Sequence, residues 1–160
     1  MNKYGFPEKL TKTHKIKQFD CGTEELNAYL KKYAHQNQEK NISNTFVVTK
    51  SDAVVGYYTL TFGAVRKENL PPKGNLPNYP IPVMILARLA VAESEKSKGL
   101  GKALLKNAIL KTLQASEIAG IKAIMVKSKN SVSKSFYQKY SFLESPIDEY
   151  TLFLPIESLK

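Results

Sequence analysis

The chain has 160 residues, of which 42% are hydrophobic, and a formal net charge of +10. This length and apolar content favour a single domain, residues 1–160, with a real core. No apolar run is long enough to span a membrane and no signal peptide opens the chain, so we expect a soluble, cytoplasmic protein. With Cys21 as the one cysteine and His14 and His35 as the two histidines, the sequence excludes an internal disulfide and argues against a metal site.

The positive charge is unevenly distributed along the chain. Residues 96–139 contain ten lysines and one acidic residue, Glu117, which gives this segment a charge of +9. The rest of the chain has fourteen basic and thirteen acidic residues and carries +1. Such an asymmetry favours a polyanionic partner, and it exceeds the charge that one small phosphorylated cofactor needs.

The first third of the chain predicts an edge strand and a helix. Residues 12–19 are expected to form the short strand, and residues 19–23 form a turn in which Thr23 serves as the helix N-cap. The helix has two glutamates in its first turn, where the helix dipole favours negative charge. Its apolar stripe follows helical spacing and predicts buried positions at Leu26, Tyr29, Leu30, Tyr33 and Ala34.

A hairpin and a proline-rich loop follow. Residues 45–49 and 53–62 predict two strands joined by a tight turn, and Gly56 inside the second strand suggests a bulge or a close backbone approach. Residues 66–82 hold five of the eight prolines and are therefore expected to be irregular. A loop of this length is often functional, and here it forms either a wall of an acceptor site or a surface insertion.

The stretch from Val83 to Leu113 predicts a strand, a basic loop and a helix. The apolar run 83–92 is typical of a central strand covered on both faces, interrupted by Arg88. The loop carries Gly99 and Gly101 between lysines, and apolar residues then recur at helical spacing. A glycine-containing turn that opens a helix directs backbone N–H groups at one point, so the stretch predicts a phosphate site.

The remaining elements complete a mixed α/β order. Residues 121–126 predict a short strand, residues 132–140 a short helix and residues 150–154 the final strand. No internal repeat or linker separates these elements, which supports one layered domain.

The glycine loop has three possible interpretations. A dinucleotide-binding loop needs a third glycine that this chain lacks, and the spacing of a Walker A loop is also absent. The segment resembles the acetyl-CoA loop Arg/Gln-x-x-Gly-x-Gly/Ala of the GNAT N-acetyltransferase superfamily, here Lys96-Ser97-Lys98-Gly99-Leu100-Gly101. Lys96 replaces the usual Arg or Gln, so a point charge stands where a planar group is common.

A second motif and several fragments extend the resemblance over nearly the whole chain. Family members often have Phe-Tyr-x-x-x-Gly-Phe, which is similar to residues 136–142 except that Ser141 replaces the glycine. A narrower group, the GNAT toxins of type II toxin–antitoxin systems, is similar in the segments Phe19-Asp20-Cys21-Gly22, Asn44 to Val48, Val55 to Tyr58, Ala87 to Val91 and Leu152 to Pro155.

The resemblance implies a fold, a cofactor and partners. The GNAT fold has a central, mostly antiparallel twisted sheet with a V-shaped splay between its two central strands, flanked by helices. Toxins of this group acetylate the α-amine of aminoacyl-tRNA with acetyl-CoA as co-substrate, are held by a ribbon-helix-helix antitoxin, and are expected to form homodimers. Arg88 and Lys73 are assigned to the tRNA side. The residues that match the cofactor site are Leu89, Ala90, Val91, Lys96, Ser97, Lys98, Gly99, Leu100, Gly101, Lys102, Ala103, Asn130, Ser133 and Phe136.

The transfer chemistry agrees with an α-amine acceptor. Residues 79–92 contain no Asp or Glu that would serve as a strong base. An α-amine titrates at about 7.7–8.0, against about 10.4 for lysine, so a useful neutral fraction exists without such a base. The leaving thiolate needs a proton, and Tyr137 matches the family position of that acid, with a backbone N–H of residues 89–91 stabilising the oxyanion.

Two other functions remain open at this point. The first is a GNAT enzyme of the same fold that acetylates a small-molecule or protein amine. The second is a non-catalytic nucleic-acid-binding module that uses the +9 segment. Acetyl transfer to charged tRNA supports the toxin, and transfer only to another amine supports the first alternative. Salt-dependent RNA binding without saturable acetyl-CoA binding supports the second.

Overall fold

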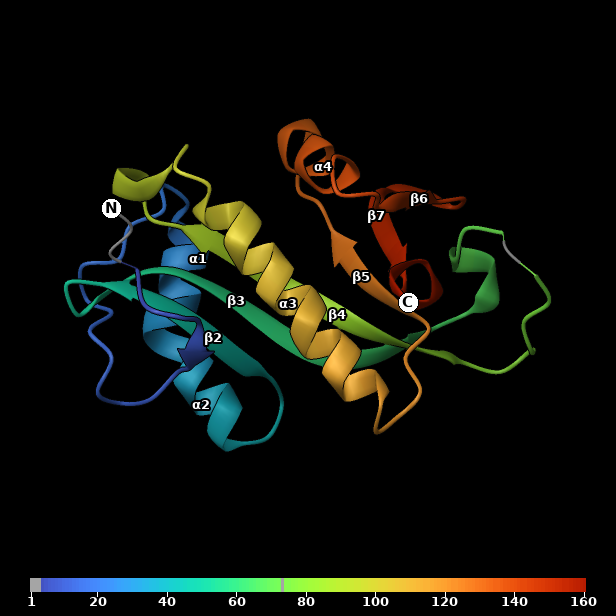
Figure 1. Cartoon of the computed structure of the whole chain (residues 1–160), viewed down its shortest axis with the longest axis horizontal. Helices are drawn as coiled ribbons and strands as arrows, with labels where there is room; N and C mark the ends of the chain where they lie inside the picture. Colours follow the sequence, from blue (N-terminus) through green and yellow to red (C-terminus); the bar gives the residue numbers. More distant parts are fainter. Residues whose placement is uncertain (1–3, 73) are drawn as a thin grey trace. The chain divides into compact units, whose positions relative to one another are not determined.

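The computed structural model describes residues 4–72 and 74–160, which form both strands and helices (Figure 1). Seven strands are hydrogen-bonded in the order β1-β2-β3-β4-β5-β7-β6. Strands β4 and β5 pair in parallel, whereas the pairs β1–β2, β2–β3, β5–β7 and β6–β7 are antiparallel. The mostly antiparallel mixed α/β sheet is therefore confirmed. The strands are β1 (Glu8–Lys9), β2 (Asn44–Lys50), β3 (Ala53–Val65), β4 (Ile81–Val91), β5 (Ala123–Lys127), β6 (Leu143–Ser145) and β7 (Asp148–Pro155).

The helical elements of the described residues include one π-helical turn, five short 3₁₀ or α segments and two longer helices. They are α1 (Glu24–Ala28), the π-helical η1 (Tyr29–Tyr33), α2 (Ala34–Glu39), η2 (Lys67–Asn69), η3 (Glu93–Glu95), α3 (Leu100–Ser116), α4 (Ser131–Gln138) and η4 (Ile156–Leu159). Two compact units divide the chain: residues 1–61 with 87–110, and residues 62–86 with 111–160. Strands β3 and β4 and helix α3 each contribute residues to both units.

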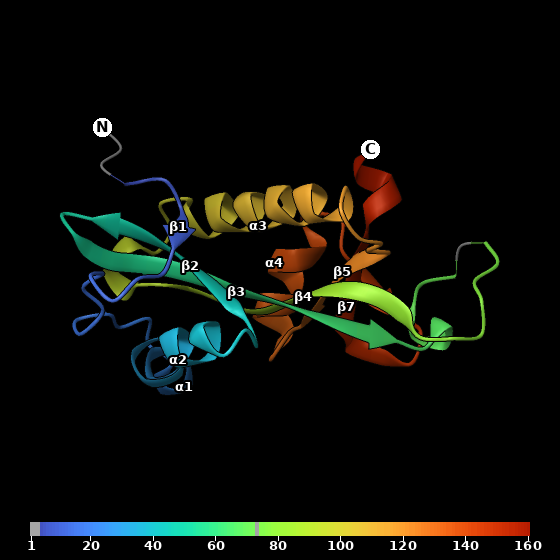
Figure 2. The same cartoon turned by 90° about the horizontal axis from the view of Figure 1, so that it is seen from below.

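In the first unit, α1, η1 and α2 cover one face of β2 and β3, and the first part of α3 covers the other face (Figure 2). Alternation along β3 sets these contacts. Tyr57 points to the α1 side, where its hydroxyl donates to the Leu26 carbonyl at 2.7 Å. Tyr58 points to the α3 side and donates to the Asn107 side chain.

Gly56 provides the close approach that the sequence suggested. A Cβ atom there would lie 3.0 Å from Leu104 and 3.2 Å from Leu100, both on α3. The register of the hairpin also shifts after the Val48↔Gly56 pair, because Thr49 pairs with Val54. Both the bulge and the close approach are thus confirmed, and they let α3 pack directly on the strand.

The edge-strand prediction for residues 12–19 is wrong. The first strand is β1, whose two residues pair with Phe46 and Val47, and residues 11–14 turn away from the sheet. The His14 Nδ1 atom accepts a hydrogen bond from the Thr11 backbone N–H at 2.9 Å. This local side-chain bond offers the backbone an alternative to pairing and stabilises the turn.

The buried stripe of the first helix is only partly as predicted. Tyr29, Leu30 and Ala34 are buried, whereas Tyr33 is 52% exposed. The reason is η1, in which the Ala34 N–H donates to the Tyr29 carbonyl across an extra residue. This insertion shifts the face that the following residues present to the core.

The extra residue also aims the side chain of Gln38 at the edge of the sheet. Its amide nitrogen donates to the Leu10 carbonyl at 2.7 Å, and its amide oxygen accepts from the Thr45 N–H at 3.0 Å. The side chain therefore continues the β1–β2 ladder beyond the point where β1 ends.

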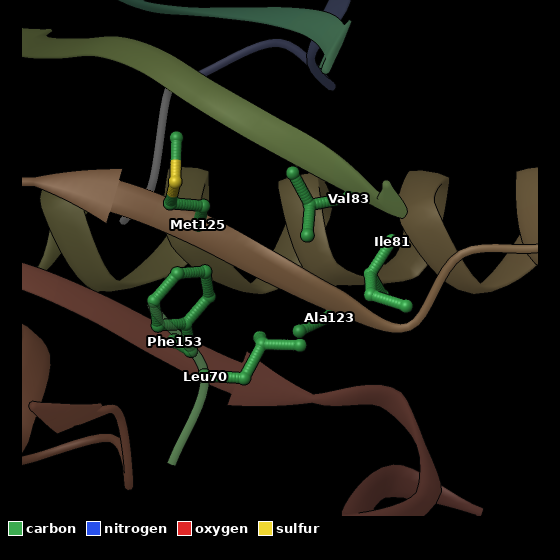
Figure 3. Close-up of a cluster of buried hydrophobic side chains, with 6 residues drawn as sticks. All are labelled: Leu70, Ile81, Val83, Ala123, Met125 and Phe153. Atoms are coloured by element: carbon green, nitrogen blue, oxygen red, sulfur yellow. The ribbon is translucent and has the colours of Figure 1, made fainter. Parts of the chain in front are cut away.

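In the second unit, β5 lies between β4 and β7. Val83 to Ile85 pair in parallel with Ala123 to Met125, and β7 pairs with the other edge of β5. The V-shaped splay predicted between the two central strands concerns residues beyond these three pairs, and it stays a prediction. Figure 3 shows the apolar cluster around β5, formed by Leu70, Ile81, Val83, Ala123, Met125 and Phe153.

Candidate functional site

The first group of predicted site residues lies at the N-terminus of α3 in the first unit. The loop residues Lys96 to Gly99 are exposed, and the first intrahelical bond runs from the Ala103 N–H to the Gly99 carbonyl at 3.1 Å. Gly99 therefore occupies the N-cap position and has no side chain to satisfy the helix amides. The first turn of α3 contains no acidic residue. This helix start is suited to bind an anion.

The backbone of the loop is unusual at two positions. Gly99 has φ +85, and a Cβ atom built there meets nothing within 4 Å. Ser97 has φ +66, a left-handed conformation that is uncommon for a residue with a side chain. Glycine at position 99 is thus required by the backbone conformation, and the space beside it is open to a ligand.

Two of the loop lysines contact acceptors within the protein. The Lys96 ammonium donates to the Cys21 carbonyl at 2.8 Å and lies 3.7 Å from the Glu93 carboxylate. The Lys98 ammonium lies 3.5 Å from the Glu95 carboxylate. Lys102, in the first turn of α3, is exposed. The lysines therefore differ in role, since Lys96 and Lys98 also tie the loop to neighbouring segments.

Strand β4 leads into this loop and carries the next predicted residues. Ala90 is buried, whereas Leu89 and Val91 are half-buried, and the Ala92 N–H donates to the Val55 carbonyl at 2.8 Å. Arg88 is half-buried and its guanidinium lies 3.7 Å from the centre of the Tyr29 ring. In the part of the chain that the structure describes, no carboxylate lies within ion-pair distance of Arg88. A stacked cation without an acidic partner is available to bind an anion.

The second group lies on α4 in the second unit. Asn130 is the N-cap: its side chain accepts from the Ser133 N–H at 2.9 Å, and Ser133 completes a capping box. Both side chains are therefore engaged in starting the helix. The structure places Phe136 against two tyrosines, with ring centres 5.1 Å from Tyr137 and 5.3 Å from Tyr140.

Tyr137 is the buried aromatic residue of this helix. Its side chain is 7% exposed, and its ring packs against Phe142 with centres 5.4 Å apart. Burial raises the pKa of Tyr137. Its hydroxyl therefore stays protonated at neutral pH, which is the state that a general acid requires.

The turn at the end of α4 explains how Phe142 packs against Tyr137. Ser141 has φ +74, so serine adopts the left-handed conformation that glycine usually supplies after a helix. The Ser141 N–H donates to the Gln138 carbonyl at 3.0 Å. The turn that brings Phe142 back onto Tyr137 is formed despite the substitution.

One predicted site residue cannot be placed, and one buried residue beside the site was not predicted. Lys73 lies outside the described residues. Glu95, buried directly before the loop, was not identified from the sequence, because its partners Tyr4 and Lys50 lie 91 and 45 residues away. No cluster of metal-ligating side chains and no helix long and apolar enough to cross a membrane occurs within residues 4–72 and 74–160.

Comparison with known proteins gives a consistent result. The acetyltransferase (GNAT) domain family matches residues 41–144. The chain is 35% identical over 156 residues to a tRNA-acetylating toxin of Mycobacterium tuberculosis, covering 96% of this chain and 93% of that protein.

Solved structures agree with this match. AtaT complexed with acetyl-methionyl-tRNAfMet has a TM-score of 0.91 and 28% identity, covering 98% of this chain and 96% of that one. A tyrosine-to-phenylalanine mutant of AtaT, bound to the C-terminus of the antitoxin AtaR and acetyl-CoA, has a TM-score of 0.82 and 27% identity, covering 99% and 96%. The family match covers more than half of the chain, and the sequence and structural similarities extend over nearly all of it. The chain belongs to the GNAT acetyltransferase family.

Proposed function

We propose that this enzyme transfers the acetyl group of acetyl-CoA to the α-amine of aminoacyl-tRNA and thereby blocks translation as the toxin of a type II toxin–antitoxin system. The observation that carries the proposal is the similarity, over 96% of the chain, to a tRNA-acetylating toxin. Features described above within each unit support individual steps of the reaction.

The diphosphate of acetyl-CoA binds at the N-terminus of α3. Its oxygens accept from the amides of Leu100, Gly101 and Lys102, and the helix dipole and the Lys102 charge stabilise them. Gly99 admits the diphosphate because no side chain fills the space beside it. The pantetheine arm then follows the β4 segment Leu89 to Val91, where a backbone N–H stabilises the oxyanion.

Tyr137 acts as the general acid. The neutral amine attacks the thioester carbonyl carbon and forms the new C–N bond. The nitrogen releases its surplus proton to solvent, and the tetrahedral intermediate collapses with cleavage of the C–S bond. The phenol of Tyr137 donates its proton to the departing thiolate and regains one from solvent after CoA leaves. Its raised pKa keeps that proton in place until the thiolate forms.

The acceptor binds at the Arg88 side of β4. The guanidinium stacked on Tyr29 binds a phosphate of the tRNA. Lys73 supplies a second positive charge for the tRNA. The α-amine needs little help to lose its proton at neutral pH, since its pKa in the free ester lies at or below that of an ordinary α-amine, about 7.7–8.0.

The proposal extends to partners and location. A ribbon-helix-helix antitoxin neutralises the enzyme, the enzyme forms a homodimer, and it acts in the cytoplasm, where charged tRNA is found. The structure of AtaT bound to the C-terminus of the antitoxin AtaR supports an antitoxin as partner.

The decisive experiment follows labelled acetyl groups from acetyl-CoA to a panel of charged tRNAs. We expect label on the aminoacyl moiety, and Tyr137→Phe should lower kcat by about 100-fold with little change in KM for either substrate. Tyr140→Phe, which alters the half-buried neighbour, is the matched control and should retain activity. Label found on a small-molecule or protein amine and on no charged tRNA would replace the acceptor in this proposal.

The pH dependence of kcat tests the acid separately. With both substrates saturating, kcat should rise as the α-amine loses its proton and then stay constant up to about pH 10, the reference pKa of tyrosine. A fall in kcat well below that pH would contradict an acid whose pKa is raised by burial.

A further inference from the structure

Glu95 is a buried carboxylate directly before the glycine loop. Its side chain accepts from the Tyr4 hydroxyl at 2.6 Å and from the Lys50 ammonium at 3.2 and 3.3 Å. The Lys98 ammonium of the loop itself lies 3.5 Å away. With a residue exposure of 5%, Glu95 joins the N-terminal segment, the end of β2 and the loop at one point.

The carboxyl group of Glu95 is ionised at neutral pH. The hydrogen bond from Tyr4, followed by the hydrogen bond and charge of Lys50, lowers the pKa of Glu95 to about 2. A buried carboxylate with these partners is a poor proton acceptor, which excludes a role as the general base. It is a permanent anion that orders the cations around it.

A second anchor holds the same loop from the Phe19–Gly22 turn. The Lys96 ammonium donates to the Cys21 carbonyl at 2.8 Å, and the Glu93 N–H donates to the Asp20 carbonyl at 2.8 Å. Gly22 has φ +87, and a Cβ atom there would lie 2.0 Å from the Glu93 carboxylate. The turn and the segment before the loop are therefore in close contact.

We propose that Glu95 is a positioning residue for cofactor binding: together with the Phe19–Gly22 turn it holds the Lys96–Gly101 loop in the conformation that presents the α3 amides to a diphosphate. This inference rests on the proposed function, because it takes that loop to bind the diphosphate of acetyl-CoA. It gives a role to the Phe19–Gly22 segment, which has no place in the transfer chemistry.

The left-handed conformation of Ser97 explains why anchors are needed. Ser97 has φ +66 and lies between Lys96 and Lys98. For a residue with a side chain, this backbone conformation persists only where the surrounding structure determines it. Lys98 is tied by Glu95, and Lys96, on the other side of Ser97, is tied by Cys21.

The test is Glu95→Gln, which keeps the size of the side chain and removes its charge. We expect the Kd of acetyl-CoA, measured by calorimetry without acceptor, and its KM to rise by about tenfold, because a displaced loop loses the aligned amides. The kcat at saturating acetyl-CoA should change less than twofold. With S-acetylpantetheine, a donor that lacks the diphosphate, kcat/KM should be unchanged.

Two further variants complete the design. Asp148→Asn removes a hydrogen-bonded carboxylate from β7, and it should leave the Kd of acetyl-CoA unchanged even where it lowers the melting temperature. Lys50→Met removes one partner of Glu95 from outside the loop and should raise the Kd by about threefold, which keeps the test informative if Glu95→Gln does not fold.

Three outcomes would overturn the inference: an unchanged Kd in both Glu95→Gln and Lys50→Met, an equal loss with acetyl-CoA and S-acetylpantetheine, or an equal loss in Asp148→Asn. The binding measurements contain no acceptor. Failure of the wild-type enzyme to acetylate charged tRNA would therefore contradict the proposed function, while the comparison of acetyl-CoA Kd values among the variants would still test the role of Glu95.

Discussion

The N-termini of α3 and α4 both carry residues predicted to contact the cofactor, but the two helices begin in different ways. At α3 the N-cap is Gly99, which has no side chain, and the loop before it is exposed and held by charges. At α4 the N-cap is Asn130, and its capping box with Ser133 satisfies the helix start from within the chain. The difference teaches that a helix start binds an anion with its amides only where the sequence leaves those amides open.

The largest expected effect comes from closing the α3 start. Gly99→Asp places a side chain at φ +85 and a negative charge where the diphosphate binds, so the Kd of acetyl-CoA should rise by about 100-fold, measured by calorimetry. Gly74→Asp is matched in backbone conformation and free space, with φ +69 and nothing within 4 Å, and should leave this Kd unchanged. Equal losses in the two variants would attribute the effect to backbone strain.

Opening the α4 start should have a smaller effect of a different kind. Asn130→Ala removes the cap and should lower the free energy of unfolding by about 1 kcal/mol, measured by urea denaturation. The Kd of acetyl-CoA should change less than threefold, because the Asn130 side chain is engaged with Ser133. A loss of binding comparable to that of Gly99→Asp would show that Asn130 contacts the cofactor directly and would remove the contrast between the helices.

The smallest effect concerns the other end of α4. Ser141→Gly should raise the free energy of unfolding by about 0.5 kcal/mol, because glycine adopts the left-handed conformation without a steric cost. Ser135→Gly, inside the helix, should lower it by about 0.5 kcal/mol, and urea denaturation measures both. The same sign for both substitutions would contradict a local conformational cause.

The sequence predicts the parts of the site that depend on local spacing. The helix after Gly99, the short helix predicted for residues 132–140 and the hairpin around residues 51–52 follow from glycine, spacing and alternation patterns, and the structure confirms them. The two-residue β1 and the three-residue β6 were not predicted, because so few residues show no alternation.

The predictions that were wrong or missing depend on contacts between residues far apart in the chain or on an irregular backbone. Tyr33 was expected in the core, since no sequence pattern marked the π-helical turn before it. Glu95 was missed because Tyr4 and Lys50 meet it only in the folded chain. The role of Lys96 in binding the Cys21 carbonyl was missed for the same reason.

The π-helical turn η1 has a consequence for association between molecules. The side-chain amide of Gln38 caps the edge of β2 where β1 stops, so a foreign strand finds no free ladder there. If the same residues were wound as an ordinary α-helix, without the π-helical turn, everything after η1 would be rotated by about 100°. Gln38 would then no longer contact the edge of β2, and the exposed backbone groups could pair with a strand of another molecule. The π-helical turn therefore protects this sheet edge against strand addition, domain swapping and self-aggregation.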